Sequence, residues 1–157
     1  MWWLFYRNDD VGVLCCLFDP WSNSGVFLYL CFVDNNFLGC FAEYLFCAEC
    51  TKRGFIVSMP VLHSSPYDCI LDVNGKLLKV QIKSSQKTPS DRLNSVCVPL
   101  QNSKTIYTKS LVDYFAVYSE YYDGFFVFPN KGEMKSIRLS LIGRNKIYFR
   151  NFDFNHS

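Results

Sequence analysis

Residues 68–83 read Asp68-Cys-Ile-Leu-Asp-Val73, then Asn74-Gly75, then Lys76-Leu-Leu-Lys-Val-Gln-Ile-Lys83. Asn-Gly between two apolar runs predicts a two-residue hairpin turn, because a type I′ turn requires positive φ at both central residues. Such a turn pairs Val73 with Lys76, and counting outward places Asp68 opposite Gln81. The register of this one hairpin therefore determines which of its side chains can meet.

One face of the hairpin is apolar and the other is polar, because side chains alternate faces along a strand. The apolar face consists of Cys69, Leu71, Val73, Leu78, Val80 and Ile82. Asp68, Gln81 and Lys83 fall on the other face and supply a carboxylate, an amide oxygen and an ammonium. These groups together are typical of a metal-dependent phosphodiesterase. Asp72 shares their face but lies farther along, opposite Leu77, and we expect it to be solvated.

The chemistry of phosphodiester hydrolysis explains why these residue types belong together. A hard divalent cation lowers the pKa of the attacking water and neutralises charge that develops on the phosphorane. Mg²⁺ prefers oxygen ligands and keeps several waters, so one or two carboxylates are enough. Asp68 would supply the main ligand and Gln81 a neutral amide oxygen. Lys83 would orient the water or stabilise the anionic transition state.

The rest of the chain predicts one helix and several strands. Residues 37–53 form a helix that is apolar on nearly every side, so we expect it to be mostly buried. Gly54 ends this helix as its C′ residue. Strands are expected at residues 55–59, 95–99, 104–108, 111–118, 125–128 and 137–142, with a turn at Asp123-Gly124, while residues 147–154 are ambiguous. A helix followed by strands argues for an α+β fold with a mixed central sheet.

Residues 1–36 differ from the rest, since they are rich in Trp, Phe, Leu and Cys and carry little charge. Their apolar runs lie at 11–18 and 26–33, with a turn between them. Two interpretations stay open. The segment is either an extra hairpin that covers a sheet edge or an N-terminal extension outside the functional domain, translated from an upstream start codon.

Composition narrows the class of protein. The length of 157 residues suggests one functional domain, and the net charge of +2 says little about partners. From Lys76 onward, however, Lys and Arg outnumber Asp and Glu, which permits a polyanion-binding surface. The eight cysteines mostly sit inside apolar runs, so we expect reduced thiols and a cytoplasmic setting. Cys47 and Cys50 have CxxC spacing, but no second CxxC completes a zinc site.

The sequence also predicts no association with membranes. A spanning helix needs about 20 consecutive apolar residues, and the apolar runs near the N-terminus are much shorter. No basic segment precedes them, which argues against a signal peptide.

Several segments resemble the motifs of the PD-(D/E)XK nuclease superfamily. They are Ala42-Glu43-Tyr44 in the helix, Tyr67-Asp68 entering a strand, and Val80-Gln81-Ile82-Lys83 on the next strand. The resemblance is greatest to the branch of small intron-encoded homing endonucleases and relatives, in which Gln replaces the second acid. It runs from about Leu38 to about Phe154 and includes Lys52-Arg53-Gly54, Asp113-Tyr-Phe-Ala-Val-Tyr118 and Ile137-Arg-Leu-Ser140.

The resemblance implies a restriction-endonuclease-like fold over residues 37–154, with a mixed central sheet flanked by helices. It implies a Mg²⁺-dependent endonuclease of homing or restriction type that cleaves double-stranded DNA, with Mn²⁺ as a substitute cation. Because one site cuts one strand, a homo-oligomer, either dimer or tetramer, is expected.

The resemblance also extends the set of site residues. The backbone carbonyl of Ile82 is implied as a further metal ligand, and Glu43 as a carboxylate beside the metal. The alternative for Glu43 is an exposed glutamate at the rim. Gln81 removes one negative charge from the commonest pattern, so the cation should bind weakly until the phosphate contributes oxygens.

Candidates for the DNA surface are Ser84, Ser85, Tyr107, Lys109, Lys131, Lys135, Arg138, Arg144, Lys146 and Arg150. Phosphate contacts of this kind position a duplex without reading its sequence. Each of these residues fits an ordinary solvated face equally well. We expect Asp113 to be a structural carboxylate bonded to backbone, and His63 to be a loop histidine rather than a base.

Other functions remain open. The runner-up enzyme is a structure-specific nuclease, such as a relative of the Holliday-junction resolvases. A catalytically silent DNA-binding module would keep the nuclease-like fold and hold DNA without cutting it. A structural or interaction protein would show no nucleic-acid affinity and no effect of metal ions on thermal stability.

Overall fold

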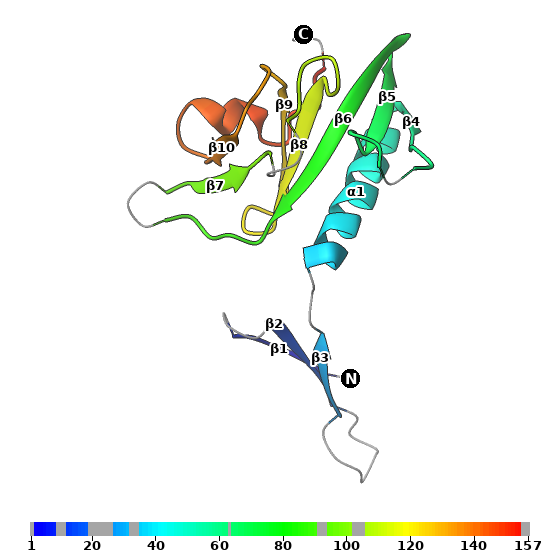
Figure 1. The fold of residues 1–157 in the computed structure, drawn as a ribbon. Coiled ribbons are helices and arrows are strands. Elements are labelled where there is room, and N and C mark those ends of the chain that lie inside the picture. The colour runs from blue at the N-terminus through cyan, green and yellow to red at the C-terminus, as the bar shows by residue number, and fades with distance from the viewer. Residues whose placement is uncertain are drawn as a thin grey trace. The chain divides into compact units, whose positions relative to one another are not determined.

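The computed structural model describes residues 2–8, 12–18, 27–31, 35–62, 64–90, 94–101 and 106–154, so His63 lies outside the described residues. Contacts within the chain divide it into two compact units, Met1–Leu38 and Gly39–Ser157. In the first unit, β1 (Trp2–Asn8), β2 (Gly12–Phe18) and β3 (Phe27–Cys31) form an antiparallel sheet in that order (Figure 1). β2 and β3 fall within the two apolar runs expected from the sequence.

The second unit is built on a five-stranded mixed sheet. Its strands are β4 (Ile56–Ser58), β5 (Cys69–Val73), β6 (Lys76–Ser85), β8 (Tyr114–Ser119) and β9 (Gly124–Pro129), adjacent in that order. All neighbouring pairs are antiparallel except β6 and β8, which are parallel. This α+β arrangement, with one helix and a second small sheet, confirms the predicted restriction-endonuclease-like fold class.

The β5–β6 hairpin has the predicted register. Val73 pairs with Lys76, and pairing continues to Cys69 and Val80. Asn74 and Gly75 have φ angles of 55° and 85°, both positive as a type I′ turn requires. The side chain of Asp72 supports the turn, since its Oδ1 accepts a hydrogen bond of 2.7 Å from the N–H of Gly75.

The second hairpin, β8–β9, turns at the predicted position, and Asp123 has a φ of 46°. β8 begins later than expected, at Tyr114, because the N–H groups of Leu111 and Val112 both donate to Thr108 O at 3.1 Å and form a turn before the strand. The N–H of Asp113 donates to Lys79 O, and its Oδ2 accepts from the N–H of Lys79, both at 2.8 Å. This confirms Asp113 as a structural carboxylate, which holds the start of β8 beside β6.

Helix α1 (Asn35–Lys52) packs on one face of the sheet. The Phe46 ring is fully buried and lies 5.3 Å from the Phe125 ring and 5.7 Å from the Phe152 ring. The expectation of a mostly buried helix is wrong, because Phe41 and Tyr44 are 50% and 63% exposed. The helix forms an outer layer on the sheet, so only the side facing the strands is covered.

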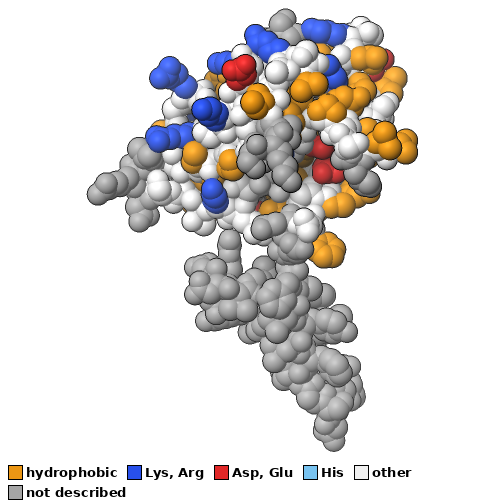
Figure 2. Space-filling model, viewed as in Figure 1, with side chains coloured by type: hydrophobic (Ala, Val, Ile, Leu, Met, Phe, Trp, Pro, Cys, Tyr) orange, Lys and Arg blue, Asp and Glu red, His pale blue; other side chains and the backbone are white. Residues whose placement is uncertain are grey.

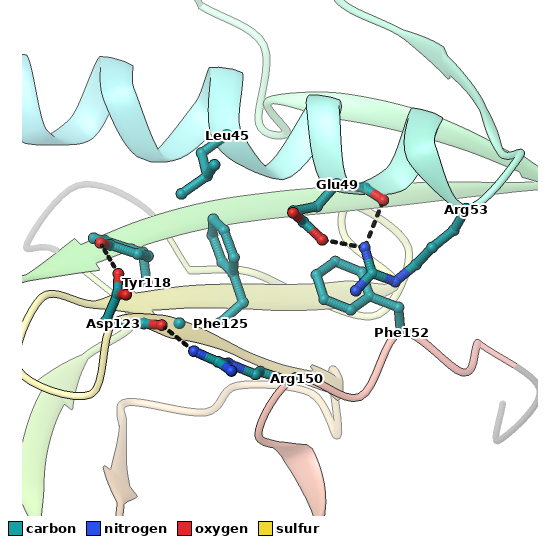
Figure 3. Close-up of a pocket in the computed structure, with 9 residues that line it drawn as sticks. Leu45, Glu49, Arg53, Tyr118, Asp123, Phe125, Arg150 and Phe152 are labelled. Atoms are coloured by element: carbon teal, nitrogen blue, oxygen red, sulfur yellow. Dashed lines mark hydrogen bonds and ion pairs between the residues drawn. The ribbon is translucent and has the colours of Figure 1, made fainter.

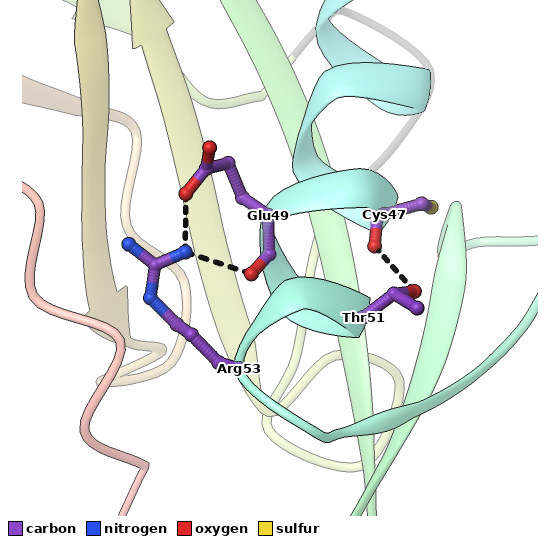
Figure 4. Close-up of polar contacts among 4 residues, drawn as sticks. All are labelled: Cys47, Glu49, Thr51 and Arg53. Carbon is purple, nitrogen blue, oxygen red and sulfur yellow. Dashed lines mark hydrogen bonds and ion pairs between the residues drawn. The ribbon is translucent and has the colours of Figure 1, made fainter.

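Helix α1 ends at Lys52 and is followed by the predicted glycine, Gly54, whose φ is 86° and whose N–H donates to Thr51 O at 2.9 Å. Arg53 donates to the carboxylate of Glu49 and, at 2.7 Å, to its backbone carbonyl (Figure 4). A cation at this end of the helix interacts favourably with the partial negative charge of the last carbonyls. Within the described residues, this helix is not long and apolar enough to cross a membrane.

A small antiparallel sheet covers part of the other face of the main sheet. It consists of β7 (Val96–Pro99) and β10 (Ser136–Leu139). The core between the two sheets contains Val96, Val98, Leu100, Tyr107, Val112, Phe115, Val117, Phe126, Phe128, Ile137 and Leu139. Figure 1 shows β7 and β10 on one side of β8 and β9, with α1 on the other side.

Two expectations near the small sheet need correction. Residues 106–108 are not a strand, and residues 102–105 of the expected strand lie outside the described part. The ambiguous C-terminal segment overlaps the short 3₁₀ helix η1 (Arg144–Tyr148) and continues as an irregular chain. A single bridge joins its Phe149 to Phe126 of β9.

The two sides of α1 should respond differently to truncation. We expect Phe46→Ala to lower the free energy of unfolding by about 3–5 kcal/mol, because it leaves a cavity between helix and sheet. The matched change Tyr44→Ala, on the exposed side, should stay within about 0.5 kcal/mol of the unchanged protein. Urea unfolding followed by circular dichroism measures both, and equal losses would contradict this packing.

Candidate active site

The polar face of the hairpin lies on the side of the sheet away from α1. Gln81 pairs with Phe115 and Lys83 with Val117 across the parallel strands β6 and β8. Residues paired in this way point to the same face, and Phe115 and Val117 belong to the core beneath β7 and β10. Gln81 and Lys83 therefore lie on the face that carries the small sheet, directly beside two residues of the core beneath it.

Asp68 closes over Gln81 just before β5 begins. Its N–H donates to Val80 O at 2.9 Å, one position beyond the last ladder pair. Its Oδ2 accepts two hydrogen bonds, one of 2.6 Å from the N–H of Ile82 and one of 2.5 Å from Nε2 of Gln81. Asp68 and Gln81 thus meet as the hairpin arithmetic predicts, and the carboxylate also satisfies a backbone donor of β6.

The Gln81 amide bridges two oxygen acceptors. Besides Asp68, Nε2 donates to the carbonyl of Ile82 at 3.2 Å. Both neighbours are acceptors, so the network assigns the NH₂ group rather than Oε1 to this position. Gln81 is only 6% exposed, and its amide is therefore held at a point on which a carboxylate and a backbone carbonyl converge.

Burial dominates the electrostatics of Asp68. It raises the pKa of this carboxyl above its usual value, against the opposing effects of the Ile82 N–H, the positive charge of Lys83 and the Gln81 amide. Burial disfavours a charged carboxylate, whereas a nearby cation and hydrogen-bond donors favour it. Any further positive charge at this point would stabilise the ionised form.

Lys83 lies beside this pair and also meets Tyr107. Its Nζ is 3.4 Å from the Tyr107 hydroxyl and 5.3 Å from the centre of the Tyr107 ring. The sequence placed Tyr107 on the DNA surface, but its side chain is only 6% exposed. No local pattern pairs it with Lys83, because residues 24 positions apart meet only through the fold.

Glu43 lies on α1 one helical turn before Cys47. The hydrogen bond with Cys69 lowers the pKa of the Cys47 thiol, while burial and the charges of Glu43 and Asp68 oppose that shift. Glu43 thus lies one helical turn from a thiol that is bonded to Cys69, the residue that follows Asp68. Among the described residues, no group of three or more His, Cys, Asp and Glu side chains is placed to hold a metal ion.

The donor set nevertheless fits a hard cation. Asp68 offers a carboxylate and Ile82 a backbone carbonyl, and Gln81 adds an amide oxygen if its terminal amide makes a half-turn. Mg²⁺ takes such oxygen ligands and fills its remaining positions with water. The observed Nε2, a donor facing two oxygens, marks the point at which a cation would be favoured.

The predicted DNA-surface residues divide into two groups. Ser85 is buried, and its Oγ accepts from the N–H of Lys87 at 3.3 Å, while Ser84 is half-buried. The cations of this set are exposed: Lys109, Lys131, Lys135, Arg138, Arg144, Lys146 and Arg150. Lys131, Arg138 and Arg144 line one groove of about 780 Å³ with Ser140 and Tyr148. Figure 2 shows Lys and Arg side chains gathered over the part that carries β10 and η1.

A second hollow, of about 370 Å³, lies between α1 and the β8–β9 hairpin (Figure 3). Its charged groups already have partners. Arg53 bonds Glu49 and stacks 4.0 Å over the Phe152 ring, and Arg150 donates to Asp123 O at 2.9 Å. This hollow lies on the helix side of the sheet, apart from Asp68 and Gln81, and we do not assign catalysis to it.

Comparison with known proteins agrees with this geometry. The family model described as PD-(D/E)XK endonuclease matches residues 34–148. Among solved structures, a bacterial homing endonuclease, I-Ssp6803I, is similar at 26% sequence identity with a TM-score of 0.61, over 74% of this chain and 86% of that chain. No curated protein matches the chain. The match covers most of the chain and every element that carries the candidate site, so this chain belongs to the PD-(D/E)XK endonuclease family.

Proposed function

We propose that this nuclease is a Mg²⁺-dependent endonuclease of homing type that hydrolyses phosphodiester bonds of double-stranded DNA. The observation that carries the proposal is the convergence of Asp68 Oδ2 and the Ile82 carbonyl on the Gln81 amide, with Lys83 alongside. The similarity to a bacterial homing endonuclease supports the choice of DNA and of the homing type.

In this proposal Asp68, Gln81 and the Ile82 carbonyl hold the cation, and Glu43 adds the negative charge of a carboxylate from the helix side of the sheet. When bound, Mg²⁺ or Mn²⁺ lowers the pKa of a water and neutralises charge on the phosphate. Lys83 orients that water or stabilises the anionic transition state with its ammonium group. The chain thus contributes oxygen ligands from one hairpin and a fixed positive charge two residues farther along the same strand.

The cationic groove supplies the proposed contact with the DNA backbone. Lys131, Arg138 and Arg144 line it together, on the same side of the main sheet as β7 and β10. Their charges attract phosphates and release counterions, whatever the base sequence. Lys109 and Lys135 are further exposed cations that we assign to the same role.

A homo-oligomer follows from the stoichiometry of double-strand cleavage. The described part of this chain carries one such cluster, and one site cuts one strand. Two copies related by symmetry would present two sites to the two strands of a duplex.

The cysteines support the expected cytoplasmic setting, because thiols stay reduced there. Those that the structure describes are free: Cys40, Cys47, Cys50, Cys69 and Cys97.

Removing the groups of the site should slow cleavage strongly. We expect Asp68→Asn and Lys83→Met each to lower the rate of plasmid nicking with Mg²⁺ by at least about 100-fold. Asp72→Asn is the matched control, because it lies on the same face at the turn end and should cut normally. Salt-dependent DNA binding should persist in all three proteins. A wild-type protein that binds plasmid and four-way junctions but cuts neither with Mg²⁺ nor Mn²⁺ would favour the silent binding module.

Gln81→Glu tests the cation site without relying on cleavage. Without metal, the new carboxylate replaces a donor to Asp68 and faces a like charge, so the melting temperature should fall. Mg²⁺ or Ca²⁺ should raise it more in this variant than in the unchanged protein, because binding to the folded state stabilises it. Gln81→Leu should also melt lower but gain less from metal than Gln81→Glu. Identical metal responses of Gln81→Glu and Gln81→Leu would rule out the proposed ligand role.

The groove makes a separate prediction about affinity. Arg138→Ala with Arg144→Ala should weaken duplex binding uniformly across sequences and reduce the salt slope by about one for each lost phosphate contact. Lys52→Ala, an exposed cation at the end of α1, is the control and should leave affinity unchanged. Fluorescence anisotropy at several salt concentrations, in Ca²⁺, measures both. An unchanged slope in the double variant would exclude the groove from the DNA interface.

A further inference from the structure

We propose that Tyr107 is the positioning residue for Lys83, a step that rests on the proposed nuclease function. The Tyr107 hydroxyl lies 3.4 Å from Nζ of Lys83, where it accepts a hydrogen bond from the ammonium. The Tyr107 ring lies on the same side, 5.3 Å from Nζ, within the range of a cation–π attraction. The ammonium group of Lys83 therefore lies against the hydroxyl end of the Tyr107 side chain.

Tyr107 is itself fixed by the core. Its ring meets Phe115 edge to face, with centroids 5.6 Å apart and planes at 89°. Phe115 is the strand partner of Gln81 on the neighbouring β8. Tyr107, which contacts Lys83, therefore packs against Phe115, which is paired with Gln81. The same buried ring limits the movement of both Lys83 and Gln81.

The backbone of Tyr107 is also anchored. Nδ2 of the buried Asn130 reaches the carbonyls of Tyr107, Thr108 and Val112 at 3.1, 3.2 and 3.0 Å. The N–H of Asn130 donates to Asp113 O at 2.8 Å, and Asp113 is in turn bonded to the backbone of Lys79 in β6. The segment from Tyr107 to Asp113 is thereby tied to the strand that carries Gln81 and Lys83.

A lysine in this role needs such a partner. Its ammonium sits on a flexible four-carbon stem and carries three donors in no fixed direction. One donor directed at Tyr107 leaves the others for the water or the phosphate. A neutral phenol orients the ammonium without adding a negative charge beside it. Small displacements of a positioned group can cost about 100-fold in rate. Loss of the Tyr107 hydroxyl should therefore lower the rate of the chemical step.

The alternative role of Tyr107, direct contact with DNA, makes a different prediction. A residue that grips the duplex changes affinity when it is altered, whereas a positioning residue changes the rate at saturation. The burial of Tyr107 and its approach to Lys83 favour the second outcome.

The test is Tyr107→Phe, which removes the hydroxyl and keeps the ring. The enzyme is in saturating excess over DNA, and Mg²⁺ is also saturating. We expect the single-turnover cleavage rate to fall about tenfold, which is the effect of losing one hydrogen bond to a charged group. The dissociation constant for duplex in Ca²⁺ and the half-saturating Mg²⁺ concentration should not change. Tyr122→Phe is the matched control, because its hydroxyl lies near the Asn94 carbonyl instead.

A double-mutant cycle separates positioning from a general loss of structure. In the Lys83→Met background, measured with Mn²⁺ over long incubations, Tyr107→Phe should cost nothing further. Asn130→Ser, which loosens the anchored segment without touching Lys83, should slow wild type and again have no effect in Lys83→Met. Thermal unfolding of every variant checks that each one is folded at the assay temperature, so that the rates of folded proteins are compared.

Three results would overturn the inference: an unchanged rate in Tyr107→Phe, a loss of DNA affinity in its place, or full additivity with Lys83→Met. Failure of the proposed function itself looks different. It would appear as Lys83→Met cutting at the normal rate, or as wild type that does not cut with either cation.

Discussion

The register of the β5–β6 hairpin is the constraint on which the site depends. A slip of one residue would turn every side chain of β6 to the opposite face, burying Lys83 against α1 and exposing Val80 and Ile82. The turn prevents this slip, since Asn74 and Gly75 both adopt positive φ and Asp72 accepts from the N–H of Gly75. Asp113, bonded to the backbone of Lys79, holds the far side of β6 in the same register.

Both faces of the main sheet carry packed apolar residues, and the polar cluster adjoins one of these cores. The face toward α1 is closed by aromatic contacts such as Phe46 with Phe125. On the other face, Phe115 and Val117 belong to the core beneath β7 and β10. Phe115 is the strand partner of Gln81, so this core adjoins the polar cluster. Rigid packing therefore begins directly beside the polar cluster, which limits how far its side chains can move.

Local sequence predicts the hairpin, the glycine that follows α1 and the structural role of Asp113, because each depends on a few neighbouring residues. It does not predict which distant segments pack over each helix or strand. The apolar pattern of α1 predicted burial all round, yet the strands cover one side and leave Tyr44 exposed. Tyr107 was likewise predicted to lie on the surface, because the segments that bury it are distant in sequence. Its position next to Lys83 arises from the parallel pairing of β6 with β8 and from the bonds of Asn130, which join segments far apart in sequence.

Glutamine at position 81 resolves a conflict that a second acid would create. Burial already raises the pKa of Asp68, so another carboxylate at a position only 6% exposed would add repulsion to an existing desolvation cost. The amide instead donates to both Asp68 and the Ile82 carbonyl, and the cluster is satisfied by hydrogen bonds alone. In the proposed function the consequence would be weaker attraction for a cation, because the NH₂ group must leave before an oxygen can take its place. Metal binding would then be linked to arrival of the phosphate, whose oxygens would replace the charge that glutamine lacks.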